Sequence, residues 1–243
     1  MRYQLIIQYD GSQFHGWQVQ AKGRTVQGDI EKALSKIYSN YKINLMGAGR
    51  TDAGVHAMAQ VAHVDLSNHL SSNELQKALN GNLKKDIRID SVREVDSNFH
   101  ARFSAKAREY EYHLVKHYSP INRYYVAELK WQVDIKLLHE CAKKILGEHD
   151  FSFFCKSTSE VENKICTVLK ADWKDDGNKL FFIVRANRFL QHMVRYLVGT
   201  MIEVARGKYD LLDFISLIEN HERKIMVVRA PAKGLFLKKV FYE

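Results

Sequence analysis

Residues 46–57 read Met-Gly-Ala-Gly-Arg-Thr-Asp-Ala-Gly-Val-His-Ala, so glycines stand on both sides of an arginine and an aspartate. Glycine permits tight turns and lets a ligand approach the backbone closely. Arg50 and Asp52 are two residues apart, so in an extended loop their side chains point the same way. A carboxylate beside a guanidinium stays ionised, as a nucleophile or a general base requires. The alternative is a glycine-rich surface turn with an exposed ion pair.

The sequence around this stretch changes repeatedly between strand and helix periodicity. Alternating polar and apolar residues predict half-buried strands, and apolar residues at three- and four-residue spacing predict amphipathic helices. The elements expected in the first half are a strand at 2–9, a helix at 25–38, short strands at 43–46 and 60–66, a helix begun by the capping box at 71–74, and a strand at 87–95.

The second half repeats this order of strands and helices. The longest regular apolar stripe runs from Leu190 to Ala205 and predicts a helix. The other elements expected here are a strand at 109–116, a helix capped by Asp134, a hairpin of strands at 168–174 and 180–186, a helix at 211–218 and a last strand at 237–242.

The pattern strand–helix–strand–helix–strand thus occurs twice, with a break between Val95 and Arg108. Hairpins and split βαβ units favour an α+β fold. The expected division is an N-terminal half, 1–100, that carries the Asp52 loop, and a C-terminal half, 101–243. Only two prolines occur and no Ser/Gly linker separates the halves. We therefore expect their antiparallel sheets to merge into one platform flanked by helices.

The composition bounds the class of protein. In 243 residues, 46% are hydrophobic, which supports a core and excludes intrinsic disorder. No apolar run approaches the ~18 residues of a membrane span, and the N-terminus lacks the apolar core of a signal peptide. The expected location is therefore the cytosol.

The charge is basic and unevenly placed. The formal net charge is +9, and residues 11–28 and 177–202 contain no acid while both carry lysine and arginine. The short run 102–108 is also basic and free of acid. Such local basic surfaces suit a polyanion, of which a nucleic-acid backbone is the commonest. The alternative is that these residues form ordinary solvated basic faces.

The cysteines and histidines give no metal-site pattern. Cys141, Cys155 and Cys166 form no Cys-x-x-Cys pair, so neither a disulfide framework nor a structural zinc is expected. We interpret these thiols as reduced and mostly packed, and we assign no role to Cys155 or Cys166. Four histidines form no paired ligand arrangement, and we interpret them as polar or packed: His56, His63, His113 and His192.

Five ordered motifs resemble those of the tRNA pseudouridine synthase A family, and together they cover the whole chain. The most specific is the run 49–57, which resembles the family's signature around its catalytic aspartate. The other four are residues 9–18 together with 25–28, the Arg-x-Tyr-x-Tyr strand at 108–112, the Phe-Leu-x-x-Met-Val-Arg helix at 189–195, and Ala-Pro-x-x-Gly-Leu at 230–235.

The resemblance implies the pseudouridine synthase fold and isomerisation of uridine to pseudouridine at positions 38, 39 and 40 of the tRNA anticodon stem-loop. It implies no metal, no cofactor, and a homodimer in which one tRNA spans both subunits. Carried over by position, Asp52 is the nucleophile and Tyr110 packs on the target uracil. Arg195 pairs with the aspartate, and Arg50 assists in flipping or holding the nucleotide.

These residue types suit the chemistry. The base must leave the stack, which costs a few kcal/mol, and an aromatic ring such as Tyr110 returns roughly 1–3 kcal/mol by stacking. Asp52 must be charged, either to attack C1′ or to take a proton while a glycal forms, and the sequence leaves both routes open. Arg195 ends an apolar stretch of helix and needs an anionic partner. Tyr112, Met193 and Met201 are expected in the core.

Two other functions remain open from the residues alone. A non-catalytic RNA-binding module with RRM-like sheets would explain the basic stretches and aromatic strands, but not the glycine-framed pair of Arg50 and Asp52. A carboxylate glycosidase needs a second acid placed near Asp52, and residues 41–51 contain none.

Overall fold

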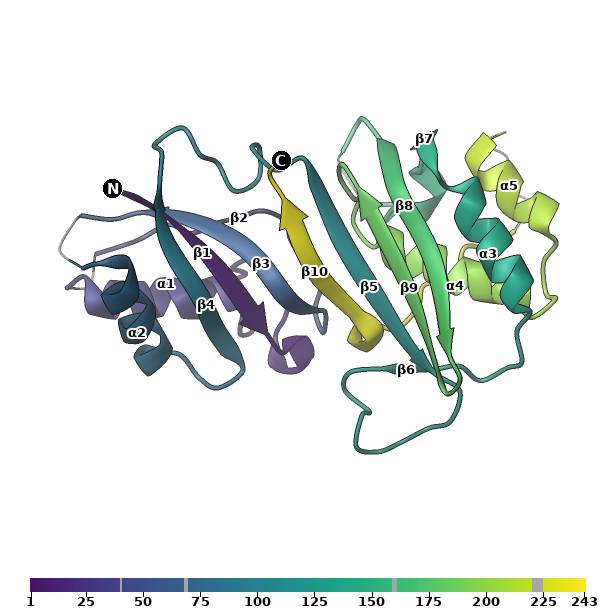
Figure 1. Ribbon diagram of the computed structural model, residues 1–243, viewed down its shortest axis with the longest axis horizontal. Coiled ribbons are helices and arrows are strands. Elements are labelled where there is room, and N and C mark those ends of the chain that lie inside the picture. Colours follow the sequence, from purple (N-terminus) through teal and green to yellow (C-terminus); the bar gives the residue numbers. More distant parts are fainter. Residues whose placement is uncertain (40, 68–69, 159–160, 220–224) are drawn as a thin grey trace. The chain divides into compact units, whose positions relative to one another are not determined.

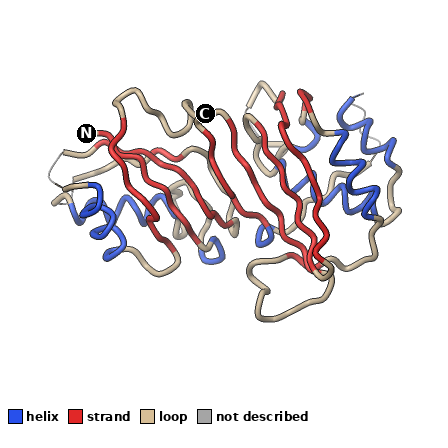
Figure 2. The backbone as a smooth tube through the Cα atoms, viewed as in Figure 1, coloured by secondary structure: helices blue, strands red, loops and turns tan. Residues whose placement is uncertain are grey.

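The computed structural model describes residues 1–39, 41–67, 70–158, 161–219 and 225–243 (Figure 1). Its internal contacts divide the chain into two units, Met1–Lys106 with Phe236–Glu243, and Ala107–Leu235. The sequence-based division at residue 100 assigned the last strand to the second half, whereas its contacts place it with the first unit. Each unit combines a mainly antiparallel sheet with helices, so the α+β class is confirmed (Figure 2).

The sheet of the first unit is centred on β1 (Arg2–Tyr9). This strand pairs antiparallel with β3 (His56–Asp65) on one side and with β4 (Ile87–Val95) on the other. The last strand, β10 (Leu235–Phe241), pairs parallel to β3, and the short β2 (Met46–Gly47) pairs antiparallel to it. The residues that lie beside Asp52 in the chain therefore lead directly into a central strand.

One face of β1 forms the core of this unit, because Tyr3, Leu5, Ile7 and Tyr9 are all buried. The helices α1 (Val26–Ile37) and α2 (Ser72–Asn82) pack against each other, and α2 packs against β4. Local signals begin both helices. The hydroxyl of Thr25 accepts the N–H of Gly28, and Ser71 and Glu74 form the expected capping box.

The second unit contains a sheet in the order β5-β9-β8-β7. Its strands are β5 (Ala107–Val115), β6 (Ala127–Glu128), which pairs parallel to β5, β7 (Gly147–Asp150), β8 (Ile165–Asp176) and β9 (Lys179–Ala186). Its helices are α3 (Ile135–Lys144), α4 (Met193–Ala205) and α5 (Leu211–Glu219), and these three pack on one another. Single 3-10 turns occur at η1 (Gly11–Gln13), η2 (Ser152–Phe154) and η3 (Ala232–Gly234).

Several expected elements differ at their ends. Helix α4 begins at Met193 and not at Leu190, because His192 has a left-handed backbone (φ +68°) that cannot continue a helix. Strand β3 begins four residues earlier than the expected 60, and β7 was not expected at all. The expected strand at 43–46 is reduced to the two residues of β2, so the Asp52 loop is bounded closely by β2 and β3.

The expected core positions are confirmed. Tyr112, Met193 and Met201 are at most 1% exposed. Cys141, Cys155 and Cys166 are all buried and form no disulfide. Within the ranges described, no helix is both long enough and apolar enough to cross a bilayer.

Candidate active site

Asp52 lies in the loop that joins β2 to β3. Its side chain is partly exposed, while the neighbouring Thr51 and Val55 are buried. The N–H of Val55 donates to the carbonyl of Asp52 at 3.2 Å and closes a turn, in which Gly54 has φ +77°. The turn thus leaves the carboxylate of Asp52 partly exposed between two buried residues, Thr51 and Val55.

Residues 9–17 hold this loop from the other side. The N–H of Trp17 donates to the carbonyl of Thr51 at 3.1 Å, and the N–H of Gly54 donates to the carbonyl of Phe14 at 3.3 Å. The hydroxyls of Tyr9 and Thr51 are 2.8 Å apart and buried. The backbone on both sides of Asp52 is therefore fixed by hydrogen bonds.

Two glycines make this close approach possible. A Cβ atom on Gly11 would lie 2.0 Å from the carbonyl oxygen of Val55, and one on Gly16 would lie 2.7 Å from that of Thr51. Gly16 also has φ +94°, a conformation that side-chain-bearing residues rarely adopt. The sequence shows these glycines as part of a glycine-rich segment, but their role as a support for the Asp52 loop was not predicted.

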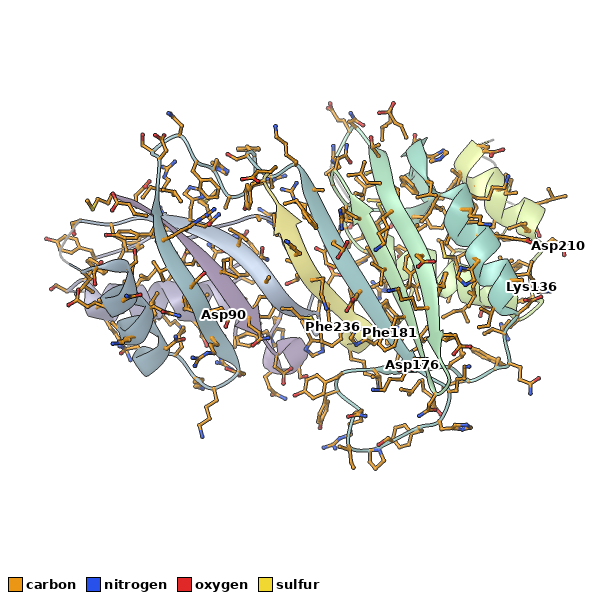
Figure 3. All side chains as sticks on the ribbon, viewed as in Figure 1. Asp90, Lys136, Asp176, Phe181, Asp210 and Phe236 are labelled. Carbon is orange, nitrogen blue, oxygen red and sulfur yellow. The ribbon has the colours of Figure 1, made fainter. Side chains whose placement is uncertain are left out.

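Buried polar groups complete the support. Gln60 on β3 is fully buried, and its Nε2 donates to the carbonyl of Gly49 at 2.9 Å. Burial raises the pKa of the Tyr9 phenol far above its ordinary value, so this group stays neutral beside Thr51. His56 accepts the N–H of Gly11 at Nδ1 (3.0 Å) and stacks on Phe236, whose position on β10 is labelled in Figure 3. The interpretation of His56 as a packed histidine is confirmed.

Arg50 differs from the expectation drawn from its spacing. Its side chain is exposed and makes no ion pair with Asp52 or with any other residue that the structure describes. The guanidinium therefore remains available to a ligand. Arg50 and Asp52 are thus neighbours in the loop, but their side chains form no ion pair with each other.

Tyr110 lies on β5 in the second unit. It is 8% exposed, and its ring contacts that of Phe189 edge-on, with the ring centres 5.1 Å apart. Phe189 belongs to the segment that precedes α4, so two of the motifs noted in the sequence meet at this aromatic pair. An edge-on neighbour fixes the plane of the Tyr110 ring.

Arg195, in the first turns of α4, is tied to the C-terminal segment. Its Nε donates to the carbonyl of Ala230 at 2.9 Å, and the N–H of Ala230 donates back to the carbonyl of Arg195 at 3.0 Å. The next residue, Pro231, accepts the hydroxyl of Tyr112 at 2.8 Å. Burial raises the pKa of Tyr112, and the positive charge of Arg195 partly offsets this rise.

Two glycines let residues 228–234 pack against α4 and β5. A Cβ atom on Gly199 would lie 2.1 Å from the carbonyl oxygen of Val228, and one on Gly234 would lie 2.8 Å from that of His113. The sequence gives no signal that this segment orients Arg195. Within the ranges described, no group of three or more His, Cys, Asp or Glu residues could hold a metal ion.

A family model described as tRNA pseudouridine synthase matches residues 5–104 and 141–243 of this chain. These ranges include Asp52 and Arg195 with the segments that support them. Tyr110 lies between the two matched ranges.

Full-length relatives carry the same description. Three proteins named tRNA pseudouridine synthase A match 100% of this chain. The one from Geobacillus kaustophilus is 40% identical and matches over 95% of its length. Those from Exiguobacterium sp. and Latilactobacillus sakei are 36% and 38% identical and match over 98% and 99% of their lengths.

A solved chain from a Cbf5-Nop10-Gar1 complex covers 83% of this chain and 53% of its own length at 13% identity. Its TM-score of 0.33 is too low to carry an argument. The family model and the full-length relatives together show that the chain belongs to the tRNA pseudouridine synthase family, whose members are isomerases that convert uridine to pseudouridine in tRNA.

Proposed function

We propose that this enzyme isomerises uridines 38, 39 and 40 in the anticodon stem-loop of tRNA, with Asp52 as its nucleophile. The observation that carries the proposal is the loop itself. It holds a partly exposed carboxylate on backbone that Trp17, Phe14 and Tyr9 fix from the opposite side. A catalytic group needs such a rigid support, because small misplacements reduce rates strongly. The choice of positions rests on the resemblance to the synthase A group.

Asp52 acts in its ionised form. Either its carboxylate attacks C1′ of the ribose as the glycosidic bond to N1 breaks, or it takes a proton from the sugar as a glycal forms. In both routes the released uracil rotates and its C5 bonds to C1′, as the ester to Asp52 breaks or as the proton returns from Asp52 to C2′ of the glycal. The C5 proton then leaves, and N1 gains a proton. Both routes need a charged carboxylate directed at the ribose. Both therefore predict that the Asp52→Asn variant, which carries an uncharged amide, is inactive.

Tyr110 provides the surface on which the uracil lies. The target base leaves the stack at a cost of a few kcal/mol, and an aromatic ring offsets this by roughly 1–3 kcal/mol. The edge-on contact with Phe189 supports this role, because it leaves the ring with a defined orientation before RNA binds.

Arg50 and Arg195 provide the positive charge. Arg50 is exposed and unpaired among the described residues, so it is available to contact phosphate or to occupy the space that the flipped base vacates. Arg195 is oriented through Ala230, and in this proposal its guanidinium pairs with the carboxylate of Asp52. That these residues meet at one nucleotide rests on the family resemblance.

The proposal includes a homodimer that works in the cytoplasm, with one tRNA bound across both subunits. The net charge of +9 supports a polyanionic substrate. The alternative of a non-catalytic RRM-like module is not favoured, because the family is one of isomerases.

The test uses unmodified transcripts of a tRNA that carries uridine at positions 38, 39 and 40. Carbodiimide mapping after incubation with the protein locates every pseudouridine. The proposal expects modification at these three positions and none elsewhere. Modification confined to another arm of the tRNA would overturn the assignment of the substrate site while leaving the family intact.

A further inference from the structure

Residues 96–106 of the first unit form a fixed segment that the proposed function does not use. Arg2 on β1 donates from Nη1 to the carbonyl of Phe99 at 2.9 Å. Tyr242, just after β10, donates its hydroxyl to the carbonyl of Ala101 at 2.8 Å. The segment is thus tied to β1 and to the residue that follows β10.

Two imidazoles fix the turn at the centre of the segment. His63 on β3 accepts the N–H of Ala101 at Nδ1 (3.1 Å). His100 accepts the N–H groups of Arg102 (3.1 Å) and Phe103 (3.2 Å) at its own Nδ1. The backbone of Arg102 and Phe103 is therefore held in place before any ligand binds.

The side chain of Phe103 is 76% exposed on this fixed backbone. Its ring centre lies 4.4 Å from that of His100 and 5.6 Å from the Cζ atom of Arg102, which is itself exposed. Residues 97–107 contain no acid. The turn thus presents an aromatic ring and a guanidinium together on a surface without local negative charge.

We propose that Phe103 and Arg102 form a stacking platform for an unpaired base of the bound tRNA, separate from the place of the target nucleotide. This inference rests on the proposed function, because the tRNA supplies the base. Unpaired bases are recognised by stacking on aromatic rings and guanidinium planes, and an arginine beside the ring also neutralises phosphate. A rigid backbone reduces the entropy lost when the base stacks.

The turn that presents the platform contacts β3 at His63, whereas the Asp52 loop leads into β3 at His56. Strand β3 begins at His56, four residues after Asp52, and reaches the turn at His63. Seven residues of strand span about 23 Å at ~3.3 Å each. At about 3.4 Å per stacked nucleotide, this distance corresponds to several nucleotides. Phe103 therefore holds the RNA and does not touch the reacting uridine.

The test measures equilibrium binding of unmodified tRNA by Phe103→Ala, Phe103→Leu and Phe103→Trp. The alanine and leucine variants are expected to raise Kd about tenfold, because neither can stack a base, whereas tryptophan keeps it within about threefold. In turnover, KM rises more than kcat falls. Tyr41→Ala, which removes another exposed aromatic ring (75%) from the same unit, is the matched control and leaves Kd unchanged.

Three results would overturn the proposal that Phe103 and Arg102 form a stacking platform. Wild-type Kd in Phe103→Ala would show that the ring does not touch RNA. Wild-type Kd in Phe103→Leu would show an apolar contact without stacking. A smaller species in sedimentation for Phe103→Ala would show that the ring packs against a second copy of the chain. Failure of the proposed function is distinguishable, because wild-type protein would then not modify residues 38–40 of the tRNA.

Discussion

At the scale of single residues, the loop that carries Asp52 depends on positions where only glycine fits. Gly16→Ala places a side chain on backbone with φ +94° and 2.7 Å from the carbonyl of Thr51. We expect a loss of about 1–3 kcal/mol in the free energy of unfolding, and a larger loss of turnover because Asp52 moves. Urea denaturation and a turnover assay measure the two effects.

Gly81→Ala is the control for this substitution. Gly81 lies in α2, has no atom within 4 Å of an added Cβ, and is far from φ > 0. Alanine there should raise the free energy of unfolding by about 0.5–1 kcal/mol and leave turnover intact. Equal stability of Gly16→Ala and wild type would mean that the close approach at Thr51 is not required.

Arg195 tests whether the guanidinium acts by its charge or only by its packing. Arg195→Met keeps the length of the side chain but removes the charge and the bond to Ala230. Single-turnover rates should fall by orders of magnitude, because in the proposed mechanism the guanidinium pairs with the carboxylate of Asp52. Arg195→Lys should retain more activity than Arg195→Met. Wild-type rates in folded Arg195→Met would remove this residue from the mechanism.

At the scale of elements, the sequence predicted what local signals determine. The bounds of β1 and β4 and the caps of α1, α2 and α3 follow from alternation, spacing and polar caps near in the chain. The early start of β3 and the whole of β7 depend on pairing with distant strands, which periodicity does not report. The start of α4 depends on one left-handed residue, His192.

The site was predictable to a different extent. Asp52, Tyr110 and Arg195 are proposed as site residues because their motifs resemble those of a known family, and this assignment stays a prediction. The bracing of the loop by residues 9–17 and the bond from the Arg195 side chain to Ala230 were missed, because both involve backbone groups of segments distant in sequence. At some glycines an added Cβ atom would overlap another segment of the chain. A single sequence shows only that glycine stands there and does not show this close approach.

The tie between β3 and residues 96–106 should depend on pH. Burial, together with the nearby charges of His100 and Arg2, lowers the pKa of His63 to about 4, although Asp65 acts in the opposite direction. Below pH ~6.5 the unfolded chain binds a proton at His63 that the folded chain excludes. The free energy of unfolding should therefore decrease as pH falls from about 6.5 to about 4.

His63→Asn isolates this effect. The amide oxygen can still accept the N–H of Ala101 but does not titrate. Urea denaturation at a series of pH values should show a smaller decrease for the variant than for wild type. Parallel curves for the two proteins would contradict the assignment of His63 as a neutral acceptor.

At the scale of the whole molecule, the basic charge predicts how tRNA binds. If the acid-free stretches contact phosphates, affinity should fall at least tenfold between 50 and 200 mM salt, because about two released counterions suffice for this change. Filter binding at salt concentrations across this range gives the slope of log affinity against log salt concentration. A flat response would show that these stretches, such as 177–202, are ordinary solvated faces.

The central claim, that the carboxylate of Asp52 carries the reaction, is tested most directly by Asp52→Asn at saturating tRNA. The amide keeps the shape of the side chain and loses its charge. Asp52→Ala, measured beside it, guards against recovery of the carboxylate by deamidation. Asp90→Asn removes an exposed carboxylate from β4 of the same unit and serves as the matched control (Figure 3).

Carbodiimide mapping of single-turnover reactions is the measurement. The account predicts no pseudouridine with either variant of Asp52, tRNA affinity within about tenfold of wild type (~1.4 kcal/mol), and normal conversion by Asp90→Asn. Appreciable conversion by a folded Asp52→Ala protein would contradict it.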